Sequence, residues 1–318
     1  MPSRIAVIGE VLVDRFEDGR EIIGGAPMNV AWNLCGFGLD PLFISAVGDD
    51  ATGEKILAAM NDFGMSTRGI QRSQSHDTGV VDITLDDGEP TYDIRRDVAY
   101  DFVESSSALA AIGDHFAQAT DDHDRSVLYH GSLAYRASTT RQAIDDLKRQ
   151  TDADVFFDIN VRDGHFETSW LEPLMRGVTI LKCNWDEGGM LLDMPLDEAD
   201  GETLQKLSQR FADQGLRVCY LTAGSSGAHV VREDGHHASV ETPRIDDEAF
   251  QDAVGAGDAF AATTIAAHML GVAPEQALVL AVEHAAKVCT LRGATTTDRD
   301  FYAETAEAIR RLAGHSGA

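Results

Sequence analysis

The stretch DAVGAGDAFAATTIAAHML, residues 252–270, joins a glycine-rich loop to a small, apolar helix pattern. Gly255 and Gly257 can adopt backbone conformations that other residues avoid, and Asp258 follows them where the helix begins. The unpaired N–H groups and the dipole of a helix start stabilise an anion. A dinucleotide fingerprint is excluded because Phe260 stands where that motif needs a third glycine. A P-loop is excluded because an aspartate follows Gly257 instead of a lysine.

The position of Asp258 allows two interpretations. An aspartate at a helix start commonly caps the helix by accepting a backbone N–H bond. A carboxylate beside converging N–H groups can also take a proton from a hydroxyl while those groups stabilise a phosphoryl group in transfer. The spacing alone favours neither interpretation.

Outward from this stretch, strand and helix patterns alternate along most of the chain. Helix patterns occupy residues 27–38 and 52–64, and each ends in glycine. Six apolar runs show no alternation with polar residues: 4–10, 41–47, 126–132, 154–160, 178–184 and 217–224. A helix candidate follows each of the last four runs. This pattern predicts an α/β fold whose mostly parallel sheet lies between helices.

Two segments interrupt this alternation and are typical of β-hairpins. The first, residues 11–25, turns at Asp18 and Gly19, and the second, residues 78–97, turns at residues 86–89. Apolar residues of the second hairpin alternate with polar ones, so its strands are expected to be half exposed. We therefore predict one α/β domain over residues 1–318, with a small β-sheet flap over its site.

Composition and charge exclude several classes of function. The chain carries 53 acidic and 26 basic residues, a formal charge of −27, which would repel nucleic acid and anionic membranes. No apolar stretch is long enough to span a bilayer. The four cysteines are far apart in sequence, which indicates neither a zinc site nor a disulfide framework. The first residues match a strand rather than a targeting peptide, so a reduced, cytoplasmic protein is expected.

Polar residues near the first hairpin suit a ligand rich in hydroxyl groups. Gly24 and Gly25 let a ligand approach the backbone just before a helix, and Asn29 lies one turn into that helix. Asp14 lies on the first strand of the hairpin. An amide and a carboxylate beside a glycine pair can bind hydroxyls. A plain turn and a surface helix residue would explain the same pattern.

Three further segments follow predicted strands at the edge where α/β sheets bind ligands. Asp158, Asn160 and Arg162 fit an Asx turn, although the guanidinium could face a phosphate or sugar oxygens. Asn184 and Glu187 fit a capping box or a pair that organises Mg²⁺ waters. The third segment fits a nucleotide loop or a hairpin loop, through Thr222, Gly224 and Gly227.

Together these segments resemble the ribokinase-like (PfkB) carbohydrate kinase family over essentially the whole chain. The specific motifs are GGAPMNVAWNLCGFG with AVGDD, residues 24–38 and 46–50, and then DAVGAGDAF, residues 252–260. The resemblance implies a three-layer fold with a β-sheet lid built from the two hairpins. It also implies transfer of the γ-phosphoryl group of ATP, with Mg²⁺, to a sugar hydroxyl.

The resemblance also implies roles for individual residues. Asp258 would be the general base, beside an anion hole of Gly255, Ala256 and Gly257. Sugar-binding positions by this resemblance would be Asp14, Gly25 and Asn29. Apart from the resemblance, we also expect Gly24, Arg95, Asn160 and Arg162 to bind the substrate. Nucleotide and Mg²⁺ positions would be Asn184, Glu187, Thr222, Gly224 and Gly227, with His284 near the adenine. A K⁺ ion would lie at Asp252, Val254 and Gly293. A homodimer formed through the lid is a further expectation.

Within the family, the segments GGAPMNVA, HGSLAYR and FFDINVR look most like fructokinases, so fructose is the expected sugar. A 2-keto-3-deoxygluconate kinase stays open, because Arg95, Arg96 and Arg162 could hold a carboxylate or a phosphate. A ribokinase also stays open. Departures from the family pattern are Ile159, Cys183, Ala253 and His284.

Functions outside this class are less well supported. A Rossmann oxidoreductase needs a first-turn GxGxxG, and the first strand is followed by a single glycine. A non-catalytic sugar-binding relative is disfavoured because Asp258 and both adjacent glycines are present.

Overall fold

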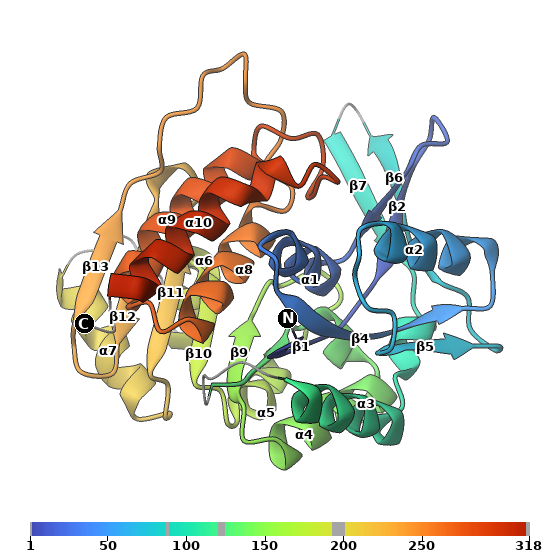
Figure 1. The fold of residues 1–318 in the computed structure, drawn as a ribbon, viewed down its shortest axis with the longest axis horizontal. Helices are drawn as coiled ribbons and strands as arrows, with labels where there is room; N and C mark the ends of the chain where they lie inside the picture. The colour runs from blue at the N-terminus through green and yellow to red at the C-terminus, as the bar shows by residue number, and fades with distance from the viewer. Residues whose placement is uncertain (1, 87–88, 120–124, 193–200, 316–318) are drawn as a thin grey trace.

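The computed structural model describes residues 2–86, 89–119, 125–192 and 201–315. Two sheets organise this part of the chain. The larger has nine strands in the order β13-β12-β11-β10-β9-β8-β1-β4-β5, and the smaller has four, β3-β2-β6-β7 (Figure 1). In chain order the strands of the larger sheet are β1 (Pro2–Ile8), β4 (Asp40–Gly48), β5 (Ile70–Ser73), β8 (Val127–His130), β9 (Asp154–Asp158), β10 (Ile180–Asn184), β11 (Val218–Thr222), β12 (Ala228–Arg232) and β13 (His237–Val240).

Buried strands form the centre of the larger sheet because their side chains pack on both faces. From β5 to β11 all neighbouring strands are parallel, while β12 and β13 add an antiparallel edge. Within β1, Ile5 and Val7 join one core cluster while Ala6 and Ile8 join the other. A sheet buried on both faces has no polar side to alternate with, which explains the continuous apolar runs.

Helices cover each face of this sheet (Figure 1). One face packs on α1 (Ala26–Gly36), α2 (Ala51–Asp62), α8 (Ala256–Met269), α9 (Pro274–Val288) and α10 (Asp300–His315). The other packs on α3 (Ser105–Gln118), α4 (Ser138–Gln150), α5 (Leu171–Met175) and α7 (Gly201–Ala212). The predicted α/β architecture is confirmed. No helix within the described ranges is long and apolar enough to cross a membrane.

The smaller sheet is the lid. It combines the two predicted hairpins, β2 (Leu12–Phe16) with β3 (Glu21–Gly24) and β6 (Gly79–Asp86) with β7 (Glu89–Ile94), through parallel pairing of β2 with β6. Figure 1 shows it standing beside α1 at one end of the larger sheet. The hairpin prediction is confirmed, although residues 87–88 of the second turn lie outside the described residues.

One prediction about element order is wrong. The run that became β11 was expected to precede a helix, but a short turn at Gly224–Ser226 leads instead into the antiparallel strand β12. The hairpin interpretation of this glycine-rich loop is therefore correct as a description of the backbone.

Candidate active site

The loop before α8 is held in a conformation that requires glycine at one position. Gly255 has φ 80° and is the N-cap residue of α8. A Cβ at Gly255 would lie 2.4 Å from the Cβ of Ala294, so the loop packs directly on that neighbouring segment. Backbone strain and close packing together exclude larger residues at this position.

The first amides of α8 differ in what they can bind. The N–H of Ala256 donates to Ala253 O at 3.2 Å, and the N–H of Ala259 donates to Gly255 O at 2.8 Å. Between them, the N–H groups of Gly257 and Asp258 have no backbone acceptor in the described part of the chain. The prediction that the N–H of Ala256 helps to form the anion hole is therefore wrong, because this N–H already has an acceptor.

Asp258 is not the cap of this helix. Gly255 takes the N-cap position, no side chain caps α8, and Asp258 lies in the first turn with 8% of its surface exposed. Asn29 Nδ2 on α1 donates a hydrogen bond to Asp258 Oδ2 at 2.8 Å. Burial raises the pKa of Asp258 to about 6, and the bond from Asn29 opposes the rise. The capping interpretation fails, and a carboxylate suited to proton transfer near neutral pH remains.

A buried ion pair lies under the same loop. Lys182 on β10 and Asp158 at the end of β9 are register partners on neighbouring strands, and Lys182 Nζ lies 2.8 and 2.9 Å from the two carboxylate oxygens. A Cβ at Gly257 would be 3.3 Å from Lys182 Nζ. Burial opposes the charge of Lys182, but the adjacent Asp158 outweighs it and holds the pKa above the usual value.

The glycine pair before α1 is packed against the chain itself. Gly25 has φ 106°, and a Cβ there would lie 2.6 Å from Glu10 O. A Cβ at Gly24 would lie 2.9 Å from Asp14 Oδ2, so this glycine makes room for the carboxylate. Burial raises the pKa of Asp14 to about 6, and the charge of Arg162 opposes the rise.

Glu10 is a buried carboxylate that the sequence did not single out. It is 4% exposed, and its Oε2 has no hydrogen-bond partner. Burial raises the pKa of Glu10 to about 7, with Arg162 lowering and Asp258 raising it. The sequence shows only that Glu10 follows a glycine after the first strand, and this pattern does not indicate that its carboxylate is buried.

Arg162 carries an uncompensated charge toward these carboxylates. Within the described ranges no carboxylate lies within ion-pair distance of its guanidinium, yet its charge lowers the pKa of Glu10, Asp14 and Asp258. The preceding turn is tight, since Asn160 has φ 43°, and Ser132 Oγ donates to Asn160 O at 3.4 Å. The turn therefore presents a cation to the ends of β1 and β9.

The capping box at the start of α6 (Trp185–Leu192) is present. Glu187 N donates to Asn184 Oδ1 at 2.9 Å, and Asn184 N donates to Glu187 Oε2 at 2.8 Å. The other oxygen, Glu187 Oε1, accepts from Val161 N at 2.8 Å. Each oxygen of Glu187 thus serves the backbone, and the side chain links this turn to the one that carries Arg162.

The predicted nucleotide loop lies beside this turn. Thr222 is the register partner of Asn184 on the neighbouring strand, which brings the two segments together at one edge of the sheet. A Cβ at Gly227 would lie 2.0 Å from Val240 O, whereas Gly224, with φ 56°, faces open space. Gly227 is therefore required by strand packing, and Gly224 is the glycine that leaves room for a ligand.

Asp252 fastens the loop before α8 to the segment after α9. Its Oδ1 accepts from Val254 N at 2.9 Å and its Oδ2 accepts from Gly293 N at 3.2 Å. The three predicted K⁺ positions are thus adjacent. No group of three acidic, histidine or cysteine side chains in the described ranges could hold a metal ion, so a cation here would need backbone carbonyls.

Two predicted residues lie apart from this cluster. His284 is 1% exposed inside the helical layer, with its ring nitrogens bonded to Asn33 Oδ1 at 3.1 Å and Thr305 Oγ1 at 3.0 Å. The prediction that His284 contacts the adenine is wrong, because its buried side chain leaves no surface for a nucleotide. Arg95 on the lid donates twice to Asp82 Oδ2, at 2.9 and 2.5 Å.

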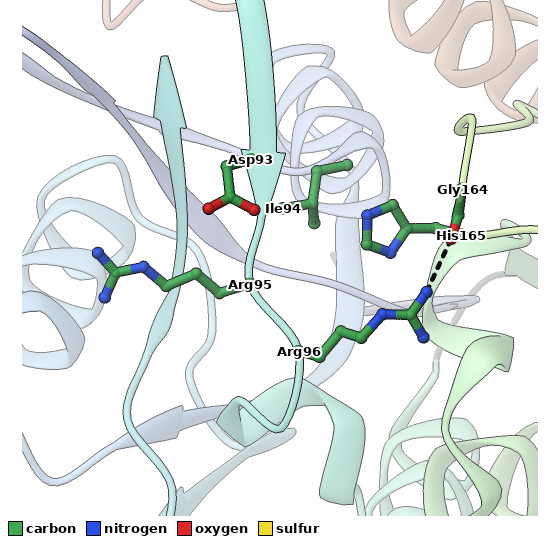
Figure 2. Close-up of a pocket in the computed structure, with 6 residues that line it drawn as sticks. All are labelled: Asp93, Ile94, Arg95, Arg96, Gly164 and His165. Atoms are coloured by element: carbon green, nitrogen blue, oxygen red, sulfur yellow. Dashed lines mark hydrogen bonds between the residues drawn. The ribbon is translucent and has the colours of Figure 1, made fainter. Parts of the chain in front are cut away.

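A cavity of about 580 Å³ lies between the lid and the turn after β9. Its lining residues are Asp93, Ile94, Arg95, Arg96, Gly164 and His165. Figure 2 shows Arg96 reaching across it to Gly164 O, at 2.7 Å, while Arg95 points the other way. The arginine that faces this cavity is therefore Arg96.

The sequence profile of the pfkB family of carbohydrate kinases matches residues 4–300. The chain belongs to this family. Like the family, it is an ATP-dependent sugar kinase, and the cluster around Asp258 lies where the two family motifs meet.

The pfkB relatives of this chain are named for different sugars. A 2-dehydro-3-deoxygluconokinase of Escherichia coli is 26% identical over 310 residues, 92% of this chain and 97% of that protein. A fructokinase of Salmonella typhimurium is 26% identical over 318 residues, 93% of this chain and 96% of that protein. Because both are equally distant, sequence identity does not select the sugar.

The fold also matches solved structures. A sugar kinase, PH1459, from Pyrococcus horikoshii, solved in complex with ATP, aligns with a TM-score of 0.76 at 23% identity over 96% of this chain and 99% of that one. This likeness supports the ribokinase-like fold.

Proposed function

We propose that this kinase transfers the γ-phosphoryl group of ATP to a hydroxyl of fructose. The observation that carries the proposal is the placement of Asp258. Its carboxylate is buried in the first turn of α8, where the backbone N–H groups of Gly257 and Asp258 have no backbone acceptor in the described part of the chain. Asn29 Nδ2 holds this carboxylate by a hydrogen bond of 2.8 Å. A base and an anion hole must lie together for a hydroxyl to attack a phosphoryl group.

Asp258 accepts the proton of the attacking hydroxyl. The hydroxyl oxygen forms the new bond to phosphorus, the bond between the γ-phosphorus and the bridging oxygen breaks, and ADP leaves with that electron pair. The open amides at the start of α8 stabilise the negative charge on the phosphoryl oxygens during the transfer. Gly255 sets the geometry by holding the loop against Ala294.

The sugar lies between the lid and α1. Asp14 and Asn160 supply oxygen acceptors and Arg162 supplies a donor. Gly24 makes room for the Asp14 carboxylate, and Gly25 lets the chain pack closely on Glu10 O. Asn29 orients Asp258 through its Nδ2 and keeps its own oxygen for the sugar. When the lid closes, it excludes water that would otherwise attack ATP.

The nucleotide lies along the edge formed by Asn184, Thr222 and Gly224. The residues fit a Mg²⁺ ion that stays bound mainly to water and phosphate, because the described side chains form no dedicated cage and Glu187 is committed to backbone N–H groups. Glu187 would act on such an ion through water. When bound, Mg²⁺ neutralises charge on the phosphates. A K⁺ ion would bind carbonyl oxygens near Asp252, Val254 and Gly293.

An acidic sugar such as 2-keto-3-deoxygluconate is a second candidate substrate. It is favoured by the cavity lined by Arg96 and His165 and by the unpaired guanidinium of Arg162, because a carboxylate binds to such donors. Among the described residues, no comparable feature favours ribose.

A coupled ADP-release assay with a panel of sugars tests the proposal. Fructose, ribose, 2-keto-3-deoxygluconate and a sugar phosphate are compared, each with and without K⁺. Fructose is expected to give the highest kcat/KM, with higher turnover in K⁺. Preference for the acidic sugar would support the second candidate instead. A lack of sugar-dependent ADP release across the panel would favour a non-catalytic sugar-binding protein.

Two proposals about assembly can be checked with the same preparation. We propose that residues 1–318 form one domain that pairs through its lid as a homodimer. Sedimentation should then give twice the mass of the chain, and unfolding should be one cooperative transition. A monomer at assay concentration would contradict the dimer.

A further inference from the structure

We propose that Lys182 is a catalytic residue whose ammonium group contacts the phosphoryl group as it crosses the loop at Gly257, and that Asp158 positions it. The inference rests on the proposed phosphoryl transfer, and nothing in the sequence motifs assigned a role to Lys182.

The strands place this ammonium group directly under the loop. Lys182 projects from β10, and its Nζ would lie 3.3 Å from a Cβ at Gly257, so glycine leaves space between the loop and the cation. The side chain is 7% exposed. An anion bound by the open N–H groups of Gly257 and Asp258 would therefore lie within reach of Lys182 Nζ.

The hydrogen bonds of Lys182 leave one donor for that anion. An ammonium group has three N–H donors. Two of them serve Asp158, at 2.8 and 2.9 Å, and the described chain supplies no acceptor for the third. Asp158 is 0% exposed and also accepts from Tyr129 OH at 3.4 Å, so it is a fixed anchor.

Stability alone does not account for a buried pair at this place. Desolvation of two charges offsets most of their attraction, and apolar residues of similar volume are often as stable. An unsatisfied donor adds to that cost. A role toward a ligand explains why the pair lies beneath the anion loop rather than elsewhere in the core.

The surrounding charges also call for a cation. Asp158, Asp258, Glu187 and Glu10 all act on this region electrostatically, whereas Lys182 and Arg162 are the cations that act on Asp258. ATP brings further negative charge. Lys182 keeps its proton throughout the transfer and stabilises the charge on the phosphoryl oxygens, while the hydroxyl proton goes to Asp258.

The test compares Lys182→Met with a matched control, Lys148→Met. Lys148 is a partly buried lysine on the opposite face of the larger sheet, where its Nζ donates to Leu174 O at 2.7 Å. Lys182→Met is expected to lower kcat by about 10²- to 10³-fold, the usual effect of removing one group that stabilises transition-state charge. Lys148→Met is expected to retain the native kcat. A Lys182→Met enzyme within about fivefold of native turnover would overturn the proposal.

A double variant separates catalysis from simple charge balance. Lys182→Met with Asp158→Asn removes both charges, so it avoids an unpaired buried carboxylate if the single variant fails to fold. If Lys182 only neutralises Asp158, the double variant recovers turnover. If Lys182 contacts the phosphoryl group, the double variant folds and stays slow.

A binding measurement keeps this proposal distinct from the proposed sugar kinase activity. Lys182→Met should weaken binding of a non-hydrolysable ATP analogue by about tenfold, the scale of one charge-assisted hydrogen bond, while ADP binding changes by less than about threefold. This ratio needs no sugar and no turnover. Equal effects on both nucleotides would contradict the role of Lys182, whereas a native enzyme inactive on every sugar would contradict the proposed function alone.

Discussion

Asn29 Nδ2 donates a hydrogen bond to Asp258 Oδ2 at 2.8 Å, across 229 positions of sequence. The two residues belong to the two segments that resemble family motifs, GGAPMN and DAVGAGD. Their helices, α1 and α8, pack side by side, and small residues on α8 permit the close approach. Two separate sequence signals therefore describe a single arrangement, in which an amide from one motif orients the carboxylate of the other.

Asp258→Asn should abolish most of the turnover. The amide keeps the size of the side chain and can still accept a hydrogen bond from Asn29, but it cannot take a proton. We expect kcat to fall by on the order of 10²-fold or more, while nucleotide affinity measured by calorimetry stays near native. Nearly normal turnover would exclude Asp258 as the base.

The same substitution should stabilise the fold at neutral pH. Burial raises the pKa of Asp258 from 3.8 to about 6, so the folded state holds this proton more tightly than the unfolded state. Native stability contributed by this group therefore falls as pH rises through that window, by about 3 kcal/mol at 1.36 kcal/mol per pH unit. Asp258→Asn should be more stable than native at pH 8 and equal to it below pH 4.

Urea unfolding at several pH values measures this difference. Comparing variant with native cancels the titration of Asp14, whose pKa is also raised. The titration of Glu10 does not cancel, because the charge of Asp258 raises the pKa of Glu10 and the variant lacks that charge. A difference that is constant from pH 4 to pH 8 would show that Asp258 ionises in the fold as it does in the unfolded chain.

Asn29→Ala should move the pH profile rather than only lower activity. The hydrogen bond from Asn29 lowers the pKa of Asp258, and a bond to a charged group contributes about 1.5 to 3 kcal/mol. The acid limb of kcat/KM should therefore shift to higher pH by about one unit or more. Asn33→Ala is the matched control.

Asn33 lies one turn further along α1, where it donates to Asn29 O and is bonded to His284 rather than to Asp258. Its replacement should lower the melting temperature without moving the acid limb. An acid limb that stays in place in Asn29→Ala would mean that the pKa of Asp258 is set by other neighbours.

The sequence predicted the backbone of the site better than its electrostatics. Gly25 and Gly255 could be recognised from the sequence because their positive φ angles and tight packing require glycine at these positions. Charged residues within strands give no such signal. Lys182 and Asp158 lie 24 positions apart, and only the register of β9 with β10 reveals that they form a pair.

The elements missed were those whose stability comes from neighbours. The strand β5 has the sequence IQRS, with no apolar pattern, and exists because β4 offers it a backbone edge. His284 was placed near the adenine through its position in the resemblance, but Thr305 and Asn33 satisfy its ring inside the core. Local sequence does not reveal such long-range partners.

Glu187→Gln tests whether this residue is chiefly structural. Its two oxygens accept from Asn184 N and Val161 N, at 2.8 Å each. Glutamine has one oxygen, so one N–H would face an NH₂ group, at a cost of about 1 to 3 kcal/mol. Urea unfolding should show that loss, and Glu172→Gln on the exposed part of α5 should show none.

A different result would restore a metal role to Glu187. If unfolding is unchanged while the Mg²⁺ concentration for half-maximal activity rises, the carboxylate acts mainly on the ion. If stability falls and the Mg²⁺ dependence is unchanged, the capping box is its main function.

Gly255→Ala should damage both fold and catalysis, and Gly235→Ala separates the causes. Both glycines have positive φ, 80° and 84°, so alanine at either pays about 1 to 2 kcal/mol for the left-handed conformation. At Gly235 nothing lies within 4 Å of the new Cβ, whereas at Gly255 it would lie 2.4 Å from Ala294 Cβ. The excess destabilisation of Gly255→Ala over Gly235→Ala therefore measures the clash alone.

The clash also has a catalytic consequence. To relieve it, the loop must move away from Ala294, and the amides at the start of α8 move with it. A displacement of about 1 Å in a positioned group can cost about 10²-fold in rate. We expect Gly255→Ala to lose kcat on that scale even where it is fully folded, while Gly235→Ala keeps native kcat. If the folded Gly255→Ala enzyme retains native turnover, the loop amides do not bind the phosphoryl group, and the proposed anion hole is wrong.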